Sequence, residues 1–183
     1  MNKVWFVSDL HFCHNKPFIY EPRGFSSIEE MNEQIIKNIN EVVNEEDDLY
    51  ILGDCFLNDN EKGMECMKRL SGRKHIIWGN HCTDARKELM IKEGFICHGY
   101  ADIIKINGYH FYLSHYPTIT SNYDIDKPLK CRVINLCGHS HTKDKFQDID
   151  KGLIYHVELD AHNNYPVEIN TIIEDIKNYM AGE

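Results

Sequence analysis

The sequence predicts an α/β fold, and two patterns support that prediction. Short apolar runs rich in β-branched and aromatic residues, such as Val4–Val7, are typical of strands that are buried on both faces. Segments with apolar residues at helical spacing separate the first three of these runs, which indicates parallel strands joined by helices. Farther along, Asn107-Gly108 separates two strand-like runs and predicts an antiparallel hairpin. The chain is therefore expected to contain both parallel and antiparallel strands.

In the first half of the chain, each expected element has its own sequence evidence. The range 12–25 after the first strand is predicted to be a loop, because it contains two prolines and a glycine. A helix is predicted to begin at Ser27, which forms a capping box with Glu30, and to run to about residue 42. The elements expected next are a strand at 49–52, a helix at 61–70, a strand at 75–78 and a helix at 83–92.

The second half of the chain has fewer helical segments. Its expected strands lie at 100–106, 109–113, 133–137 and 153–159. The range 114–130 is predicted to be a long polar loop, and its position makes it a candidate lid on the substrate side. A capping box of Thr171 and Glu174 predicts a final helix that runs to about residue 180.

The size and charge of the chain limit its class and its partners. A length of 183 residues predicts a single domain over residues 1–183, long enough to bury a substantial core. The formal net charge of −9 argues against non-specific binding to nucleic acid, because a phosphate backbone requires a basic surface. A phosphorylated substrate is still compatible with this charge when bound metal ions supply positive charge locally. The sequence gives no indication of the oligomeric state.

The sequence predicts a cytoplasmic protein that does not cross a membrane. No apolar run approaches the roughly 20 residues of a membrane-spanning helix. The first expected strand follows Met1-Asn2-Lys3 directly and leaves no room for a signal peptide. The seven cysteines are odd in number and include no C-x-x-C pair, which is typical of reduced thiols in a reducing compartment.

Polar side chains follow five of the expected strands at the point where each strand ends. They are Asp9 and His11, Asp54, Asn80 and His81, His115, and His139 and His141. In extended backbone, side chains two positions apart point the same way, so Asp9 and His11 are expected to converge. Because α/β sheets bind ligands at the carboxyl ends of their strands, we expect the five strand ends to meet at one site.

Seven of these residues form a predicted metal-binding set: Asp9, His11, Asp54, Asn80, His115, His139 and His141. Carboxylate, amide and neutral imidazole ligands suit divalent Mn, Fe or Zn better than they suit Mg or Ca. Seven groups exceed the needs of one ion and fit two ions roughly 3.5–4 Å apart that share a carboxylate. Two divalent ions against two carboxylates leave about two positive charges, which attract a phosphate and lower the pKa of a bridging water.

The order of these motifs resembles that of the calcineurin-like metallophosphoesterases. The motifs are Asp9-x-His11, Gly53-Asp54, Gly79-Asn80-His81, His115 and Gly138-His139-x-His141, and they extend across most of the chain. The resemblance implies a four-layer αββα sandwich, in which two mixed β-sheets are flanked by helices. The start of the chain and the segment Ser114-His115-Tyr116-Pro117 look most like the small single-domain bacterial and phage members.

The resemblance also implies a role for each motif residue. One ion would be held by Asp9, His11 and His141, and the other by Asn80, His115 and His139, with Asp54 bridging the two. His81 would face the scissile phosphate and protonate the leaving oxygen or stabilise the transition state. The alternative for His81 is a buried, hydrogen-bonded histidine with a structural role.

Two positions depart from the usual pattern of the family. An acidic residue usually follows the Gly-Asn-His histidine and orients its ring, but this chain has Cys82 there, and Asp84 in the next turn is a hypothetical substitute. The Gly-Asp-x-x-Asp-Arg-Gly segment of the phosphoprotein phosphatases is also absent, together with an arginine that helps to bind phosphate. Arg23, His14 or Lys16 is expected to compensate, so Arg23 and His14 are candidate substrate-binding residues.

Two further interpretations stay open at this point. His14 either contacts a substrate phosphate from the loop beside His11 or is a surface histidine. Four cysteines adjoin motif residues, and they either make the site redox-sensitive, supply a soft ligand or pack in the core. Packing is favoured, because neighbours of a ligand along a strand point away from it. These cysteines are Cys13, Cys55, Cys82 and Cys137.

The sequence therefore predicts a metal-dependent phosphoesterase. It is expected to hydrolyse a phosphomonoester or phosphodiester by in-line attack of a hydroxide that bridges two divalent ions, on a small or locally presented phosphorylated substrate. One alternative is a nuclease of the same superfamily, which the lack of a basic stripe disfavours. The other is a catalytically silent protein-interaction scaffold with the same fold, which the presence of all the ligands and His81 disfavours.

Overall fold

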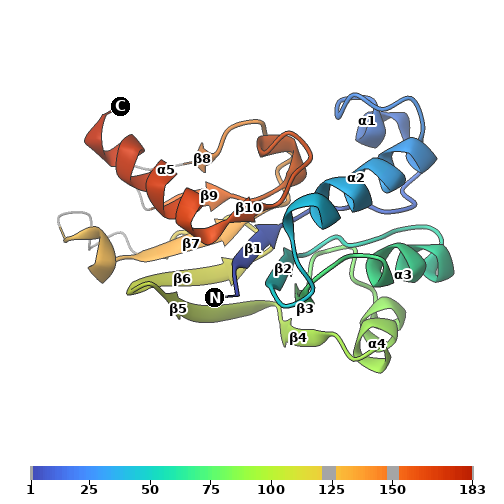
Figure 1. The fold of residues 1–183 in the computed structure, drawn as a ribbon, viewed down its shortest axis with the longest axis horizontal. Helices are drawn as coiled ribbons and strands as arrows, with labels where there is room; N and C mark the ends of the chain where they lie inside the picture. The colour runs from blue at the N-terminus through green and yellow to red at the C-terminus, as the bar shows by residue number, and fades with distance from the viewer. Residues whose placement is uncertain (1, 121–126, 148–152, 183) are drawn as a thin grey trace.

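Two mixed five-stranded sheets lie at the centre of the protein in a computed structural model, which describes residues 2–120, 127–147 and 153–182 (Figure 1). The first sheet contains β1 (Val4–Val7), β2 (Asp48–Leu52), β3 (Arg73–Ile77), β4 (Ile96–Gly99) and β10 (Val167–Glu168). Its strand order is β10-β1-β2-β3-β4, with β1 to β4 parallel and β10 antiparallel to β1. The alternation of strands and helices in the first half of the sequence thus gives the parallel part of this sheet.

The second sheet carries the predicted hairpin. It contains β5 (Ala101–Ile106), β6 (Tyr109–Ser114), β7 (Val133–Cys137), β8 (Phe146–Gln147) and β9 (Ile154–His156). Its order is β5-β6-β7-β9-β8, and β5 pairs antiparallel with β6 around Asn107-Gly108. The pairs β6–β7 and β7–β9 are parallel, so this sheet is mixed as well. The predicted α/β sandwich of two mixed sheets with helices is confirmed.

The helices are α1 (Pro17–Tyr20), α2 (Ile28–Val42), α3 (Asn60–Lys68), α4 (Asp84–Lys92) and α5 (Ile169–Ala181). Short 3₁₀ turns lie at Leu129–Cys131 and Leu159–Ala161. Figure 1 shows α2, α3 and α4 on one side of the first sheet and the second sheet on its other side. Among the described residues, no helix combines the length and the apolar composition that crossing a membrane requires.

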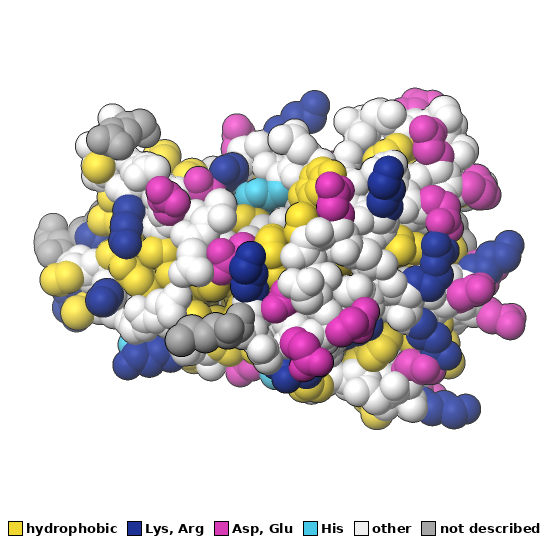
Figure 2. All heavy atoms as spheres, viewed as in Figure 1, with side chains coloured by type: hydrophobic (Ala, Val, Ile, Leu, Met, Phe, Trp, Pro, Cys, Tyr) yellow, Lys and Arg dark blue, Asp and Glu magenta, His cyan; other side chains and the backbone are white. Residues whose placement is uncertain are grey.

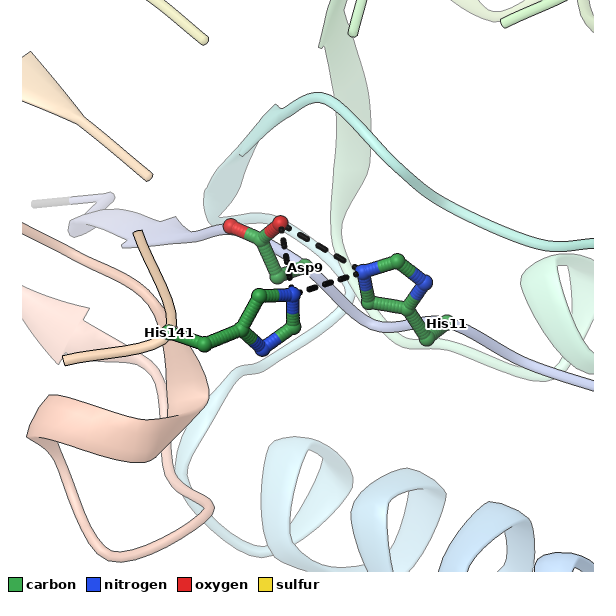
Figure 3. Close-up of side chains that lie close together, drawn as sticks. All are labelled: Asp9, His11 and His141. Carbon is green, nitrogen blue, oxygen red and sulfur yellow. Dashed lines mark hydrogen bonds and ion pairs between the residues drawn. The ribbon is translucent and has the colours of Figure 1, made fainter. Parts of the chain in front are cut away.

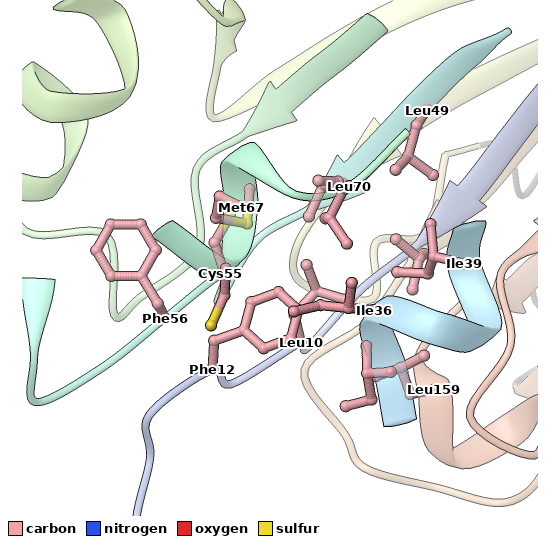
Figure 4. Packing of buried hydrophobic residues seen from close by; sticks show 14 of the residues in the cluster. Leu10, Phe12, Ile36, Ile39, Leu49, Cys55, Phe56, Met67, Leu70 and Leu159 are labelled. Atoms are coloured by element: carbon pink, nitrogen blue, oxygen red, sulfur yellow. The ribbon is translucent and has the colours of Figure 1, made fainter. Parts of the chain in front are cut away.

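Alternation along the strands of the first sheet divides the core into two clusters. Trp5 and Val7 point toward the helices and pack in a cluster with residues of α2, α3 and α4, part of which Figure 4 shows. Phe6, between them, points the other way and packs with β6, β7 and α5. Burial on both faces is the reason that these strands are continuous apolar runs in the sequence.

The first turns of two helices differ from the prediction. Ser27 caps α2 by accepting a hydrogen bond from the Glu30 amide at 3.1 Å, but the Glu30 carboxylate accepts from Ser26 instead of Ser27. Only half of the predicted capping box therefore forms. The helix α5 begins at Ile169 with Glu168 as its N-cap, so the predicted Thr171–Glu174 box is wrong. The reason is that β10 ends at residue 168 and the chain turns directly into the helix.

Short elements account for the other differences. The predicted loop at 12–25 contains α1, whose first residue is Pro17, a position where the fixed φ of proline suits a helix. Strands β4 and β10 were not predicted, since they have four and two residues and their pairing depends on neighbours distant in sequence. The predicted strand at 153–159 is shorter and spans residues 154–156.

The candidate lid at 114–130 lies partly outside the described residues, since it includes 121–126. Its described part follows the surface of β7. The Thr118 amide donates to Asn135 Oδ1 at 2.8 Å, and Thr120 Oγ1 donates to the Val133 carbonyl at 2.8 Å.

Candidate metal centre

The seven predicted ligand side chains lie together at the carboxyl ends of strands from both sheets. Asp9 and His11 follow β1, Asp54 follows β2, and Asn80 follows β3 in the first sheet; His115 follows β6, and His139 and His141 follow β7 in the second. The two sheets are joined at this edge by hydrogen bonds such as that from the Ser8 amide to the Val157 carbonyl. The five strand ends thus meet at one place, and they come from two different sheets.

The backbone conformation of the ligands differs from the extended geometry assumed for the first motif. Positive φ values are found at Asp9 (58°), His11 (50°), Asp54 (47°), His139 (74°) and His141 (49°). The left-handed region is unfavourable for residues with a Cβ, and strained residues of this kind cluster at functional sites. The expectation that Asp9 and His11 converge through strand alternation is therefore wrong in its reasoning, although their side chains do meet. Tight turns after each strand bring them together.

Asp9, His11 and His141 form the first group of candidate ligands (Figure 3). The Nε2 atoms of His11 and His141 are 3.1 Å apart, and they lie 3.5 Å and 3.7 Å from Asp9 Oδ1. Ligands bound tetrahedrally at 2.0–2.2 Å from one ion stand roughly 3.3–3.6 Å apart, so these spacings fit a single divalent ion.

Asp9 is held so that one oxygen faces this group. Its Oδ2 lies 2.6 Å from Ser8 Oγ and accepts a hydrogen bond from the His139 amide at 2.8 Å. Its Oδ1 is buried and has no hydrogen-bond partner among the described residues. A buried carboxylate oxygen without a partner is strongly unfavourable, and a bound cation removes the penalty. The residues therefore fit a metal ion at this position.

The second group contains Asp54, Asn80, His115 and His139. Asn80 Oδ1 lies 2.8 Å from His115 Nε2 and 3.1 Å from His139 Nδ1, and these two ring nitrogens are 3.3 Å apart. Asp54 Oδ2 lies 3.3 Å from His115 Nε2 and 3.9 Å from His11 Nε2, so it stands between the two groups. The other ring nitrogen of His115 donates to the Leu52 carbonyl at 2.8 Å, which leaves Nε2 free for a ligand when the ring is neutral.

Glycines in two motifs make room for this arrangement. A Cβ at Gly138 would stand 2.2 Å from Asp9 Oδ2 and 1.9 Å from Ser8 Oγ. A Cβ at Gly79 would stand 2.3 Å from Asp54 Oδ1. Both contacts are far below van der Waals distance. Only glycine at these two positions lets the Asp9 and Asp54 carboxylates lie this close to the backbone.

A residue that the sequence interpretation missed holds His141. Asp160, in the 3₁₀ turn after β9, places Oδ2 3.1 Å from His141 Nδ1. The same carboxylate accepts from Arg23 Nη2 at 2.7 Å and from Arg23 Nε at 3.1 Å. The sequence did contain a signal, since Asp160 follows the predicted strand 153–159 as the other site residues follow theirs.

The two candidate substrate-binding residues occupy different environments. The Arg23 side chain is 1% exposed, and besides Asp160 it donates to the Asp9 carbonyl at 2.8 Å. His14 is half-buried, with Nδ1 3.3 Å from His11 Nδ1, and it lines the cavity over the metal groups. Burial, together with neighbouring His11 and His81, lowers the pKa of His14 to about 4, so this ring is neutral near pH 7.

His81 faces the same cavity, which has a volume of about 510 Å³ and is lined by His11, His14, Phe18, Ile19, Asp54, Asn80, His81, His139 and His141. The His81 side chain is 42% exposed, and its Nε2 lies 4.0 Å from Asp54 Oδ2. Cys82 is buried and its Sγ accepts from the Gly79 amide at 3.2 Å. Asp84 is 93% exposed and pairs with Lys87, so it does not take the place of the missing acidic residue.

Opposite charges shift the titration of the site residues. Burial alone raises the pKa of Asp9 and lowers that of His115. For Asp9, the imidazoles of His11 and His115 outweigh burial and hold the pKa of the carboxyl below its usual range. For His115, the carboxylates of Asp54 and Asp9 outweigh burial and raise the pKa of the ring to about 9. Without a metal ion, protonated histidine thus supplies the positive charge that the carboxylates require.

The cysteines beside the motifs pack in the protein interior, which is the interpretation that the sequence favoured. Cys55, Cys82 and Cys137 are buried, and the half-buried Cys13 packs against the first core cluster. All seven cysteines are free.

Comparisons with known proteins place the chain in a family. The family model described as the calcineurin-like phosphoesterase superfamily domain matches residues 2–157. The uncharacterized protein MJ1445 of Methanocaldococcus jannaschii is 32% identical over 182 residues, which cover 97% of this chain and 93% of that protein. The Gene 66 protein of Mycobacterium phage D29 is 25% identical over 211 residues, covering 97% of this chain and 98% of its own length.

Among solved structures, AQ665 of Aquifex aeolicus, a protein of unknown function, has a similar fold. Its TM-score is 0.67 at 26% sequence identity, and the match covers 95% of this chain and 99% of that one. The fold is thus similar over nearly the whole chain.

Proposed function

The chain belongs to the calcineurin-like phosphoesterase superfamily, and from this premise we propose that it is a metal-dependent hydrolase of phosphoric esters. The observation that carries the proposal is the buried Oδ1 atom of Asp9, which has no hydrogen-bond partner among the described residues. Two histidine nitrogens lie within 3.7 Å of it, an arrangement that accounts for the orphaned oxygen when a cation is bound.

We assign the two groups of side chains to two divalent ions, which would be Mn, Fe or Zn. Asp9, His11 and His141 would hold one ion and Asn80, His115 and His139 the other, with Asp54 shared between them. When bound, the ions supply the positive charge that attracts a phosphate and that makes hydroxide available for in-line attack at neutral pH. Arg23 adds no net charge to the site, since its guanidinium is paired with Asp160.

His81 is the residue that we assign to the leaving group. It lines the cavity, and its partly exposed ring is able to exchange protons with solvent. Proton transfer to the departing oxygen is the contribution that a histidine at this position makes. His14, neutral at pH 7, is suited to a hydrogen bond with substrate or to support of His11. Arg23 acts as a positioning residue through Asp160 and the Asp9 carbonyl.

Turnover by metal-free and metal-loaded protein tests this function. Protein stripped with a chelator should be inactive, and adding Mn, Fe or Zn should restore hydrolysis of p-nitrophenyl phosphate, bis(p-nitrophenyl) phosphate or cyclic nucleotides. The Asp9→Asn variant should lose metal, measured by elemental analysis, together with turnover. A protein that binds metal but turns over none of these esters would instead be the scaffold of the second alternative.

A nuclease of the superfamily is the other outcome of the same experiment. Figure 2 shows Lys and Arg side chains scattered among Asp and Glu over the face drawn, without a basic stripe. Binding to DNA that weakens steeply with salt, together with cleavage of DNA, would favour the nuclease. A small or locally presented phosphorylated substrate is the one that the net charge of −9 favours.

A further inference from the structure

An exposed aromatic ring forms one wall of the cavity over the metal groups. Phe18 is 68% exposed and lines this cavity from the second position of α1. Its neighbour Ile19 is buried in the first core cluster, which fixes the short helix in place. The Phe18 ring lies 5.8 Å from that of His14 in an edge-on arrangement. Aromatic side chains that line a cavity are typical of surfaces that contact a ligand.

A second exposed ring stands beside the other metal group. Tyr116 is 50% exposed, and its ring lies 4.6 Å from that of His139 and 5.3 Å from that of His115. Its backbone is fixed, because the hydroxyls of Ser114 and Thr118 donate to the Tyr116 carbonyl at 2.7 Å and 3.0 Å. Each metal group therefore has one exposed aromatic ring nearby. Phe18 lies beside His14, which contacts His11 of the first group, and Tyr116 lies beside His139 of the second group.

The described side chains that line the cavity add no lysine or arginine charge to that of the metal ions. Arg23, the buried cation nearby, is fully engaged with Asp160 and the Asp9 carbonyl. A phosphomonoester carries almost two negative charges at neutral pH and one substituent, whereas a phosphodiester carries one charge and two substituents. The Phe18 ring lines the cavity, and the Tyr116 ring stands beside the second metal group. No lysine or arginine among the described lining residues adds to the metal ions to pair with a second negative charge, which favours the diester.

We propose that the substrate is a small phosphodiester with a flat aromatic ring on the ester group that stays on phosphorus, as in a nucleoside phosphodiester, and that Phe18 stacks on this ring. The proposal rests on the proposed function and deepens it. Hydrolysis forms one P–O bond to the oxygen of water and breaks one P–O ester bond. His81 gives a proton to the leaving oxygen, so the products are a phosphomonoester and an alcohol.

Two diesters with the same leaving group test the proposal. Phenyl p-nitrophenyl phosphate and methyl p-nitrophenyl phosphate both release p-nitrophenolate, so the chemical step is closely matched. In the Mn-loaded protein, the ratio of their kcat/KM values should favour the phenyl ester. Phe18→Ala should reduce that ratio by roughly tenfold, the size of one lost stacking contact, and Phe18→Trp should preserve it. Comparing variants cancels any difference in the intrinsic reactivity of the two esters.

Binding without turnover gives a second readout. The dissociation constant of diphenyl phosphate, measured by titration calorimetry, should rise roughly tenfold in Phe18→Ala, and that of dimethyl phosphate should not change. Ile103→Ala is the matched control, because Ile103 is 64% exposed on β5 and does not line the cavity. Its ratio of kcat/KM values should equal that of the unmodified protein.

The outcomes separate the two proposals. Metal-dependent turnover with the same phenyl-to-methyl ratio in the unmodified protein and in Phe18→Ala would overturn the aromatic substrate class and leave the phosphoesterase standing. Faster turnover of p-nitrophenyl phosphate than of either diester would also overturn it. Absence of turnover on every ester with Mn, Fe and Zn would overturn the proposed function, and this inference with it.

Discussion

Replacing Asp160 by Asn should weaken metal binding at the first group without removing a ligand. The Asp160 carboxylate lies 3.1 Å from His141 Nδ1, so it keeps the proton on that nitrogen and leaves Nε2 free to face Asp9 and His11. Loss of such an outer partner typically lowers metal affinity by about 10- to 100-fold, or about 1.4–2.8 kcal/mol. The Mn affinity of Asp160→Asn, measured by competition with a fluorescent chelator, should fall in that range.

A loss of fold stability has to be separated from a loss of metal affinity. Asp160→Asn also leaves the buried Arg23 guanidinium without its anion, which is expected to lower the free energy of unfolding by about 3–5 kcal/mol. The double variant Arg23→Met/Asp160→Asn removes that unpaired charge, so it should regain stability in urea denaturation but not metal affinity. Glu33→Gln is the control, because Glu33 makes a similar two-bond pair with Arg69 on the surface. Unchanged Mn affinity in a stably folded Asp160→Asn protein would refute the positioning role.

Three further results are expected. His81→Ala should lower kcat by about 10²- to 10⁴-fold at unchanged metal content, and loss of metal as well would show that the roles are divided wrongly. Gly138→Ala should lower both metal content and melting temperature, because its Cβ would stand 2.2 Å from Asp9 Oδ2; normal metal content would contradict the close packing. In metal-free protein, His115 has a pKa of about 9, above its unfolded value of about 6.5, so its stabilisation is complete below pH 6.5 and disappears as pH rises through 9. Urea denaturation should show a loss of about 3 kcal/mol over this range, and His115→Gln should flatten the dependence.

Much of the site could be predicted because each ligand directly follows an apolar strand. Strands in one sheet end at one edge, so Asp54 and Asn80 had to lie near Asp9 once β1, β2 and β3 were recognised as parallel neighbours. The backbone conformation of the candidate ligands could not be predicted in this way. Strand periodicity describes extended backbone, whereas Asp9 and His11 have φ values of 58° and 50° after the strand has ended.

The role of Arg23 shows where sequence reasoning stops. An arginine in a loop beside a predicted phosphate site is naturally interpreted as a phosphate ligand. The neighbouring sequence does not indicate a different partner. In the structure the Arg23 side chain pairs with Asp160, which is 137 positions away and reaches Arg23 through the turn that follows β9. Strand β10 is a similar case, since two residues carry no periodicity and only the pairing with β1 defines the strand.

The division of the candidate ligands between two sheets would give bound metal ions a structural role besides chemistry. Asp9 comes from the first sheet and His141 from the second, and Gly138 lets the second sheet approach until the His139 amide bonds to Asp9. This contact buries carboxylate charge that the metal-free protein balances by protonating His115. A bound ion would replace this proton and link the sheets at the same edge. The free energy of metal binding would then contribute to the stability of the fold as well as to activity.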